Sequence, residues 1–150
     1  MLTGINNFAN GVVRPFANPR VESFGMPLEH KIMPEFLKEA GYKTALSGKW
    51  HLGMSKEAFL PINRGFDSTY GHLMGGIGYF DHGFSGRLDW HRNGEVLYED
   101  GYSTTLIANE AVRIIENKDT SAPLFLYVAF NAPHTPIQAE VSDIELFEYI

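Results

Sequence analysis

The 150-residue sequence contains no cysteine at all. Disulfide bonds and thiolate metal sites are therefore excluded within it, and cysteine usage gives no information about a redox compartment. Basic residues are also few, because 12 Lys and Arg stand against 18 Asp and Glu for a net charge of −6. The sequence therefore lacks the basic stripe that neutralises phosphates, which argues against a nucleic-acid-binding protein. A local field inside a cleft can still favour a small anion.

Long hydrophobic runs are absent as well. No apolar stretch approaches the roughly 20 residues that a helix needs to cross a bilayer, and residues 1–10 lack the basic start and apolar core of a signal peptide. We therefore expect no membrane span and no signal peptide in this chain, and its compartment is left open. Apolar residues at 44% and charged residues at 20% are typical of a globular protein with one domain core.

The most informative stretch runs from Gly41 to Gly53 and has the sequence GYKTALSGKWHLG. Aromatic and β-branched residues at Tyr42–Leu46 predict a short strand, which a glycine-bracketed loop follows. The loop carries Lys49, a fixed positive charge, and His51, which exchanges a proton near neutral pH. On extended backbone these two side chains would point the same way, which suits an anionic group undergoing proton transfer. A solvated lysine and a surface histidine are the plainer alternative.

A second polar loop follows a second predicted strand. The apolar run Leu124–Phe130 is rich in β-forming residues and predicts a central strand of a mainly parallel sheet, buried on both faces. His134 lies just beyond it, in the run NAPHTP. Because ligands of open α/β sheets bind outside the carboxyl ends of the strands, we expect His134 to share a pocket with Lys49 and His51. A loop histidine held between two prolines is the alternative.

The other regular elements are predicted from periodicity and turn signals. Helical spacing of apolar residues predicts two helices, over about residues 33–40 and 104–117. On the second helix Glu110 falls opposite the apolar residues and is expected to face solvent. The pair Asn93-Gly94 predicts the turn of a hairpin. Together the elements indicate an α/β protein.

The segment 64–90 is rich in glycine and aromatic residues, which predicts a structured functional loop rather than a regular element. His72 and His91 are expected to be surface or turn histidines, whereas the role of His82 is left open. A zinc site formed by these three is conceivable, but their spacings match no compact metal motif.

Taken in order, these motifs resemble the sulfatase family. The run GYKTALSGKWHLG is similar to the second family signature, and NAPHTPIQA is similar to the segment whose histidine contacts the sulfate ester. Leu2-Thr3-Gly4 matches the last three residues of the first signature, C-x-P-S-R-x-x-x-L-T-G. The runs RGFD at 64–67 and GIGYFDH at 76–82 resemble the arylsulfatase B-like branch. The resemblance implies an alkaline-phosphatase-like three-layer sandwich with a mainly parallel sheet.

The resemblance also implies an activity, the hydrolysis of a sulfate ester of an aryl or carbohydrate substrate. Lys49 would bind the sulfate, His51 would act as the base that helps release it, and His134 would bind the ester oxygen and help protonate the leaving group. His82 and Asp81 would bind substrate near the rim of the pocket. Ca²⁺ is the cofactor that the family implies.

Several parts of the family pattern are missing from the sequence. The nucleophile, a formylglycine made from Cys or Ser, and the arginine after it would precede Met1, and the calcium ligands and a second lysine would also lie outside the chain. Residues 1–150 are therefore expected to be part of a sulfatase N-terminal catalytic domain, truncated at both ends and inactive alone. Two alternatives remain: a related phosphatase or phosphodiesterase, and a non-catalytic protein that binds an anionic glycan.

Overall fold

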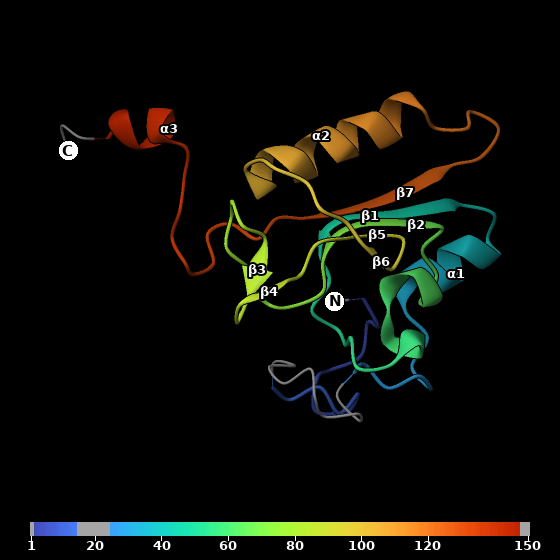
Figure 1. Ribbon diagram of the computed structural model, residues 1–150. Coiled ribbons are helices and arrows are strands. Elements are labelled where there is room, and N and C mark those ends of the chain that lie inside the picture. Colours follow the sequence, from blue (N-terminus) through green and yellow to red (C-terminus); the bar gives the residue numbers. More distant parts are fainter. Residues whose placement is uncertain (1, 15–24, 148–150) are drawn as a thin grey trace.

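The computed structural model of the protein describes residues 2–14 and 25–147. Its centre is a five-stranded sheet with the strand order β6-β5-β2-β1-β7 (Figure 1). The strands are β1 (Lys43–Lys49), β2 (Ser68–His72), β5 (His91–Arg92), β6 (Glu95–Val96) and β7 (Leu124–Ala129). β1 runs parallel to both β2 and β7, whereas β5 and β6 form the antiparallel hairpin predicted at Asn93-Gly94. The predicted α/β architecture with a mainly parallel sheet is confirmed.

Helices cover both faces of the sheet. The helix α2 (Ser103–Glu116) lies along one face, where the buried Ser47 hydroxyl donates a 2.8 Å hydrogen bond to the Ile107 carbonyl. On the opposite face α1 (Met33–Glu39) borders a buried hydrophobic cluster that contains Ile32 and Leu46. Figure 1 shows α2 and α1 on opposite sides of the sheet. Because side chains alternate along β1, Leu46 faces this cluster and the next residue, Ser47, faces α2.

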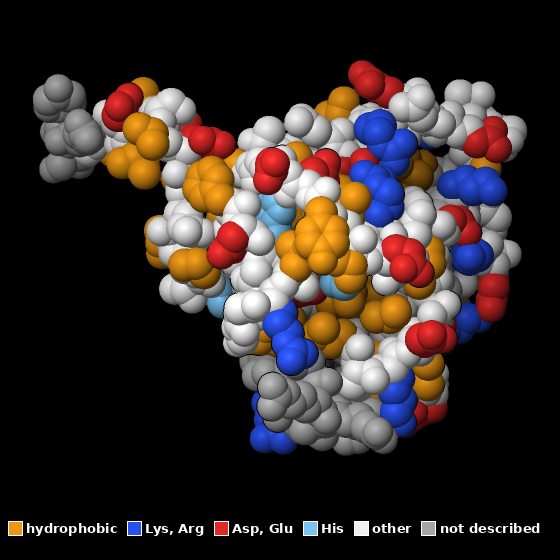
Figure 2. All heavy atoms as spheres, viewed as in Figure 1, with side chains coloured by type: hydrophobic (Ala, Val, Ile, Leu, Met, Phe, Trp, Pro, Cys, Tyr) orange, Lys and Arg blue, Asp and Glu red, His pale blue; other side chains and the backbone are white. Residues whose placement is uncertain are grey.

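The remaining elements are short. They are two 3-10 helices (Glu57–Phe59 and Pro61–Asn63), the two-stranded ribbon of β3 (Gly83–Phe84) and β4 (Arg87–Leu88), and the helix α3 (Val141–Glu145). Figure 1 shows α3 lying apart from the sheet. On the face drawn in Figure 2, Lys and Arg side chains lie among Asp and Glu side chains rather than in a stripe of their own.

The three parallel strands approach one another closely at a glycine pair. Gly48 of β1 is in register with Gly71 of β2 on one side and with Ala129 of β7 on the other. A Cβ on Gly48 would lie 2.7 Å from the carbonyl carbon of Ala129, and a Cβ on Gly71 would lie 2.7 Å from the Gly48 Cα. Both glycines have positive φ, 116° and 126°. Glycine is therefore required at both positions, one residue before the polar ends of β1 and β2.

Two strand predictions need correction. β2 lies inside the segment predicted to be a functional loop, because its sequence STYGH is too short and too glycine-containing to show a strand pattern. β7 was predicted to be central and buried on both faces, but among the described residues it is an edge strand that pairs with β1 alone. Its Val128 is 37% exposed. The apolar run therefore predicted the strand itself correctly, and within the described residues that strand lies at one edge of the sheet.

The prediction for Glu110 was also wrong. Its side chain is buried and accepts hydrogen bonds from Arg92 (2.8 and 3.1 Å) and Arg113 (2.8 and 2.6 Å). Burial opposes ionisation of this carboxyl, but the bonds from Arg113 and Arg92 outweigh burial and lower its pKa to about 2. A helical wheel places such a residue on the solvent-facing side of the helix, because the wheel includes no partner from outside the helix. Here that partner is Arg92 of β5.

The glycine approach can be tested with a matched pair of variants. Gly41→Ala places a side chain at φ 89° with nothing within 4 Å, so it should lower the free energy of unfolding by only about 1 kcal/mol. Gly48→Ala adds a backbone clash between β1 and β7, and should lower it by about 3 kcal/mol or more. Urea unfolding followed by circular dichroism measures both. Equal losses in the two variants would show that the close approach does not matter.

Candidate functional site

The polar side chains of the site stand where the parallel strands end. Lys49 is the last residue of β1 and lies in register with His72, the last residue of β2. The segment that carries His134 follows β7 on the other side of β1. As expected from the sequence, the ends of parallel strands meet at one edge of the sheet. β2 brings a third histidine to this edge.

His51 departs from the geometry expected for it. The ladder between β1 and β2 continues past Lys49, since Trp50 and His51 donate backbone hydrogen bonds to the carbonyls of His72 (2.9 Å) and Leu73 (3.0 Å). The backbone of His51 then turns to φ 55°. The prediction that His51 lies on extended backbone and points the same way as Lys49 rested on a premise that is wrong at His51. A left-handed conformation in a non-glycine residue costs about 1–2 kcal/mol and is common at functional sites.

The rings of His51 and His134 rest on two consecutive glycines. A Cβ on Gly75 would lie 2.7 Å from Nε2 of His51, and a Cβ on Gly76 would lie 2.7 Å from Cε1 of His134. No side chain fits at either glycine while the rings keep these places. The two predicted site histidines, which are 83 positions apart in the sequence, are therefore brought to neighbouring residues of one short segment.

Hydrogen bonds fix the position and the tautomer of His134. Its Nδ1 lies 2.7 Å from the Thr135 carbonyl, which only accepts, so Nδ1 carries the hydrogen. Nε2 of the neutral ring is then the acceptor. The Tyr79 hydroxyl donates a 2.9 Å hydrogen bond to the His134 carbonyl, and the Gln138 side chain accepts one of 2.7 Å from the Tyr79 amide. The loop after β7 is therefore tied to the segment that follows β2.

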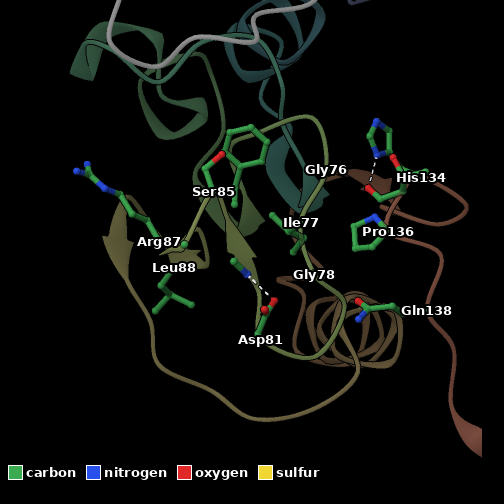
Figure 3. Close-up of a pocket in the computed structure, with 14 residues that line it drawn as sticks. Gly76, Ile77, Gly78, Asp81, Ser85, Arg87, Leu88, His134, Pro136 and Gln138 are labelled. Carbon is green, nitrogen blue, oxygen red and sulfur yellow. Dashed lines mark hydrogen bonds between the residues drawn. The ribbon is translucent and has the colours of Figure 1, made fainter.

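A cavity of about 780 Å³ opens beside His134. Figure 3 shows His134 and Pro136 on one side of it and Arg87 and Leu88 of β4 on the other. Asp81 lines the cavity, and its carboxylate accepts a 3.0 Å hydrogen bond from the Gly83 amide. The cavity is thus walled by the segment that follows β2 and the loop that follows β7. Lys49 and His51, which were expected to share a pocket with His134, do not line it.

His82, the other residue predicted near the rim, does not line this cavity. Its side chain is 1% exposed and stacks on Trp90 with ring centroids 4.5 Å apart. Its Nε2 lies 2.9 Å from the Gly101 carbonyl, to which it donates. His82 is therefore packed behind the wall that Asp81 forms.

His72 is the site residue that sequence reasoning missed. It was expected at the surface, but it is 1% exposed. Burial lowers its pKa to about 4, and the positive charge of the neighbouring Lys49 contributes to the lowering. Burial likewise lowers the pKa of Lys49. The signal that would have revealed His72 is strand β2 itself, because a histidine that ends a buried parallel strand must face the site edge.

The described residues contain neither a cluster of metal-binding side chains nor a membrane-spanning helix. Within residues 2–14 and 25–147, no group of three or more His, Asp or Glu side chains is placed to hold a metal ion. None of the helices in the same described ranges has the length and hydropathy to cross a membrane.

Known proteins of similar sequence include several sulfatases. The family model described as Sulfatase matches residues 1–146. The chain is 39% identical over 123 residues to arylsulfatase J of Mus musculus, which covers 76% of this chain and 20% of that protein. It is 32% identical over 127 residues to N-acetylgalactosamine-6-sulfatase of Homo sapiens, covering 77% of this chain and 24% of that protein. The chain thus spans about a quarter or less of these curated relatives.

Solved structures give the same answer for the fold. The crystal structure of Ps i-CgsB in complex with k-i-k-neocarrahexaose has a TM-score of 0.84 and 33% identity, covering 99% of this chain and 36% of that one. A protein in complex with its substrate D-glucosamine-2-N,6-O-disulfate has a TM-score of 0.66 and 28% identity, covering 89% of this chain and 24% of that one. The alkaline-phosphatase-like fold is thereby confirmed, and the chain belongs to the sulfatase family.

Proposed function

We propose that this chain is part of the N-terminal catalytic domain of a sulfatase that hydrolyses sulfate esters. The observation that carries the proposal is the placement of the His51 and His134 rings on Gly75 and Gly76, beside the strand end that holds Lys49. Two groups that exchange protons and one cation then face the same edge. Ester hydrolysis needs charge stabilisation on the sulfuryl oxygens and proton transfer at two oxygens.

Lys49 supplies the positive charge for the sulfate. Its ammonium group sits partly withdrawn from water at the end of β1, and burial lowers its pKa. A charge in such surroundings interacts with an anion more strongly than a fully hydrated one does, because the effective dielectric constant is lower. Lysine acts as a point charge, which suits the several equivalent oxygens of a sulfate group.

His134 is suited to the leaving-group oxygen. Because the Thr135 carbonyl engages Nδ1, proton exchange is left to Nε2. A protonated Nε2 would donate to the ester oxygen as the sulfur–oxygen bond breaks, and it would leave the alcohol neutral. The cavity beside His134 would hold that alcohol.

His51 would take the complementary role of a base. Its ring packs on Gly75 at the opposite end of the same dipeptide unit from His134. A base there would remove a proton from the sulfated nucleophile and so help to expel sulfate. Near neutral pH an imidazole is well matched to such a step.

The nucleophile and the metal would come from outside the chain. A formylglycine hydrate upstream of Met1 would supply the nucleophilic hydroxyl. The described residues do not fit a calcium site, since no group of three acidic or histidine side chains is gathered in them. The nearby Asp89 carboxylate already accepts three hydrogen bonds, from Leu73, Met74 and His91. We therefore assign calcium binding to residues outside this chain and derive no step through it.

The substrate is proposed to be a carbohydrate sulfate. The cavity is lined by Asp81, Arg87 and Gln138, whose side chains can exchange hydrogen bonds with sugar hydroxyls. Two similar proteins act on or bind sugars by their names, N-acetylgalactosamine-6-sulfatase and the protein solved with D-glucosamine-2-N,6-O-disulfate. On this proposal Asp81 contacts the sugar directly, and His82 acts through its packing on Trp90.

The activity is tested on the full-length protein of the reading frame that contains this chain. The codons before Met1 should encode C-x-P-S-R or S-x-P-S-R, and the purified protein should release sulfate from aryl and sugar sulfate esters. Sulfate release is measured by ion chromatography with and without added calcium. A different residue at the nucleophile position, together with retained binding of a sulfated glycan, would overturn the enzyme proposal and favour a non-catalytic glycan-binding protein.

Single substitutions test the assigned residues in the same protein. His51→Ala and His134→Ala should each lower kcat/KM by about 10²–10⁴-fold, because each removes one proton-transfer group. His30→Ala is the matched control, since His30 lies before α1 and does not line the cavity beside His134. Circular dichroism should show an unchanged fold in all three. Near-normal turnover of either site variant would remove that histidine from the mechanism.

A further inference from the structure

A group of polar side chains centred on the buried Asp89 contacts the turn that precedes Gly75 and Gly76. Asp89 is 4% exposed and precedes Trp90 at the start of the β5 region. His91 contacts it from the same segment, and His72 faces it from the end of β2. The proposed mechanism uses none of these side chains. Burying a carboxylate is expensive, so its partners indicate what the burial achieves.

Asp89 holds the turn that follows β2. Its Oδ1 accepts a 3.1 Å hydrogen bond from the Leu73 amide and its Oδ2 accepts one of 2.8 Å from the Met74 amide. His91 Nε2 donates to Oδ1 from 3.0 Å. Burial would raise the pKa of Asp89, but the bonds from His91, Met74 and Leu73 outweigh it and lower that pKa. The carboxylate is therefore held ionised, with both oxygens committed to neighbouring amides.

His72 closes the same turn from the other side. Its Nδ1 lies 2.9 Å from the Met74 carbonyl, which only accepts, so Nδ1 donates. Its Nε2 is buried and has no hydrogen-bond partner in the described part of the chain. Three side-chain hydrogen bonds thus fix the backbone of two successive residues, Leu73 and Met74.

The proposed catalytic histidines, which lie on other segments, rest against this turn. The Leu73 carbonyl accepts the backbone hydrogen bond of His51 at 3.0 Å. Immediately after the turn come Gly75 and Gly76, against which the rings of His51 and His134 rest. A shift of the turn would move both supports together.

We propose that Asp89 is a positioning residue for His51 and His134, acting through the turn Leu73–Gly76, with His72 and His91 as its supporting partners. The proposal rests on the sulfatase function proposed above. Asp89 accepts hydrogen bonds from Leu73, Met74 and His91, and its contribution is to place the turn against which the two catalytic histidines rest. Misplacement of reacting groups by about 1 Å can cost about 100-fold in rate.

The variant Asp89→Asn tests this directly. Asparagine keeps the size of the side chain, but its amide NH₂ replaces one of the two accepting oxygens. Whichever way the amide turns, it meets either the Leu73 amide or the Met74 amide with a donor. The variant therefore loses one of the two bonds to the turn and leaves His51 and His134 chemically intact.

Asp67→Asn is the matched control. Asp67 also accepts a backbone hydrogen bond, 3.0 Å from the Thr44 amide, but near the amino end of β1 and far along that strand from Lys49. Both variants make the same chemical change in a carboxylate that caps backbone. In the full-length enzyme, well below the unfolding temperature, Asp89→Asn should lower kcat about 10–100-fold with little change in KM, and Asp67→Asn should change neither. Equal kcat values in the two variants would overturn the proposal.

His91→Leu keeps the test decisive if Asp89→Asn does not fold. Leucine has no side-chain donor, so it removes the hydrogen bond to Oδ1 and leaves both backbone bonds of Asp89 in place. A drop in kcat of a few fold with unchanged KM supports the positioning role, and wild-type kcat excludes it. A loss of thermal stability without a change in kcat also excludes it, because it would show a structural role alone.

A second readout separates this proposal from the enzyme proposal. Long-range ¹H–¹⁵N spectra of the imidazoles report the surroundings of His51 and His134 without any turnover. Asp89→Asn should shift the signals of both rings and leave that of His30 in place, whereas Asp67→Asn should shift none of the three. If these shifts are found but sulfate esters are not hydrolysed, the positioning stands and the sulfatase proposal fails. If His51 and His134 do not respond, the positioning is wrong whatever the activity.

Discussion

The candidate site depends on how closely the backbones of three parallel strands meet at Gly48. Side chains are excluded from Gly48 and Gly71, so β1 can lie tight against both β7 and β2. One residue further on, β1 ends at Lys49 and β2 ends at His72, and these two residues lie in register. The segments that follow β1 and β7 bring His51 and His134 to the same edge of the sheet. A wider spacing of the strands would separate these groups. The sheet is thus the frame that brings a few polar residues of distant sequence position to one edge.

The second level of the site is the turn after β2. It lies between the histidines above and the buried Asp89 below, and it is fixed by hydrogen bonds on both sides. Its glycines accept the rings because they have no side chains of their own. A carboxylate, two glycines and two histidines therefore form consecutive layers, each of which is positioned by the one beneath it. Sequence reasoning concentrated on the top layer, because histidines after strands carry a recognisable pattern.

Much of the arrangement could be predicted from the sequence, for physical reasons that differ between elements. The runs at β1 and β7 have strong strand patterns, so the placing of the segments with Lys49, His51 and His134 at one edge of the sheet followed from the general geometry of parallel sheets. β2 could not be predicted, since five residues that include a glycine carry too little pattern, and its loss hid the burial of His72. The burial of Glu110 and Asp89 could not be predicted for another reason. Their buried charges depend on partners from other elements, which periodicity along one segment cannot reveal.

The support of both rings by adjacent glycines has a consequence for how such a site tolerates change. Gly75 and Gly76 are joined by one peptide bond, so the two supports move together. A displacement of this one segment therefore reaches the rings of His51 and His134 at once, whichever loops carry them. Residues of those loops that line the cavity can differ without removing this shared contact. The shape of the pocket can therefore diversify while both rings keep the same support.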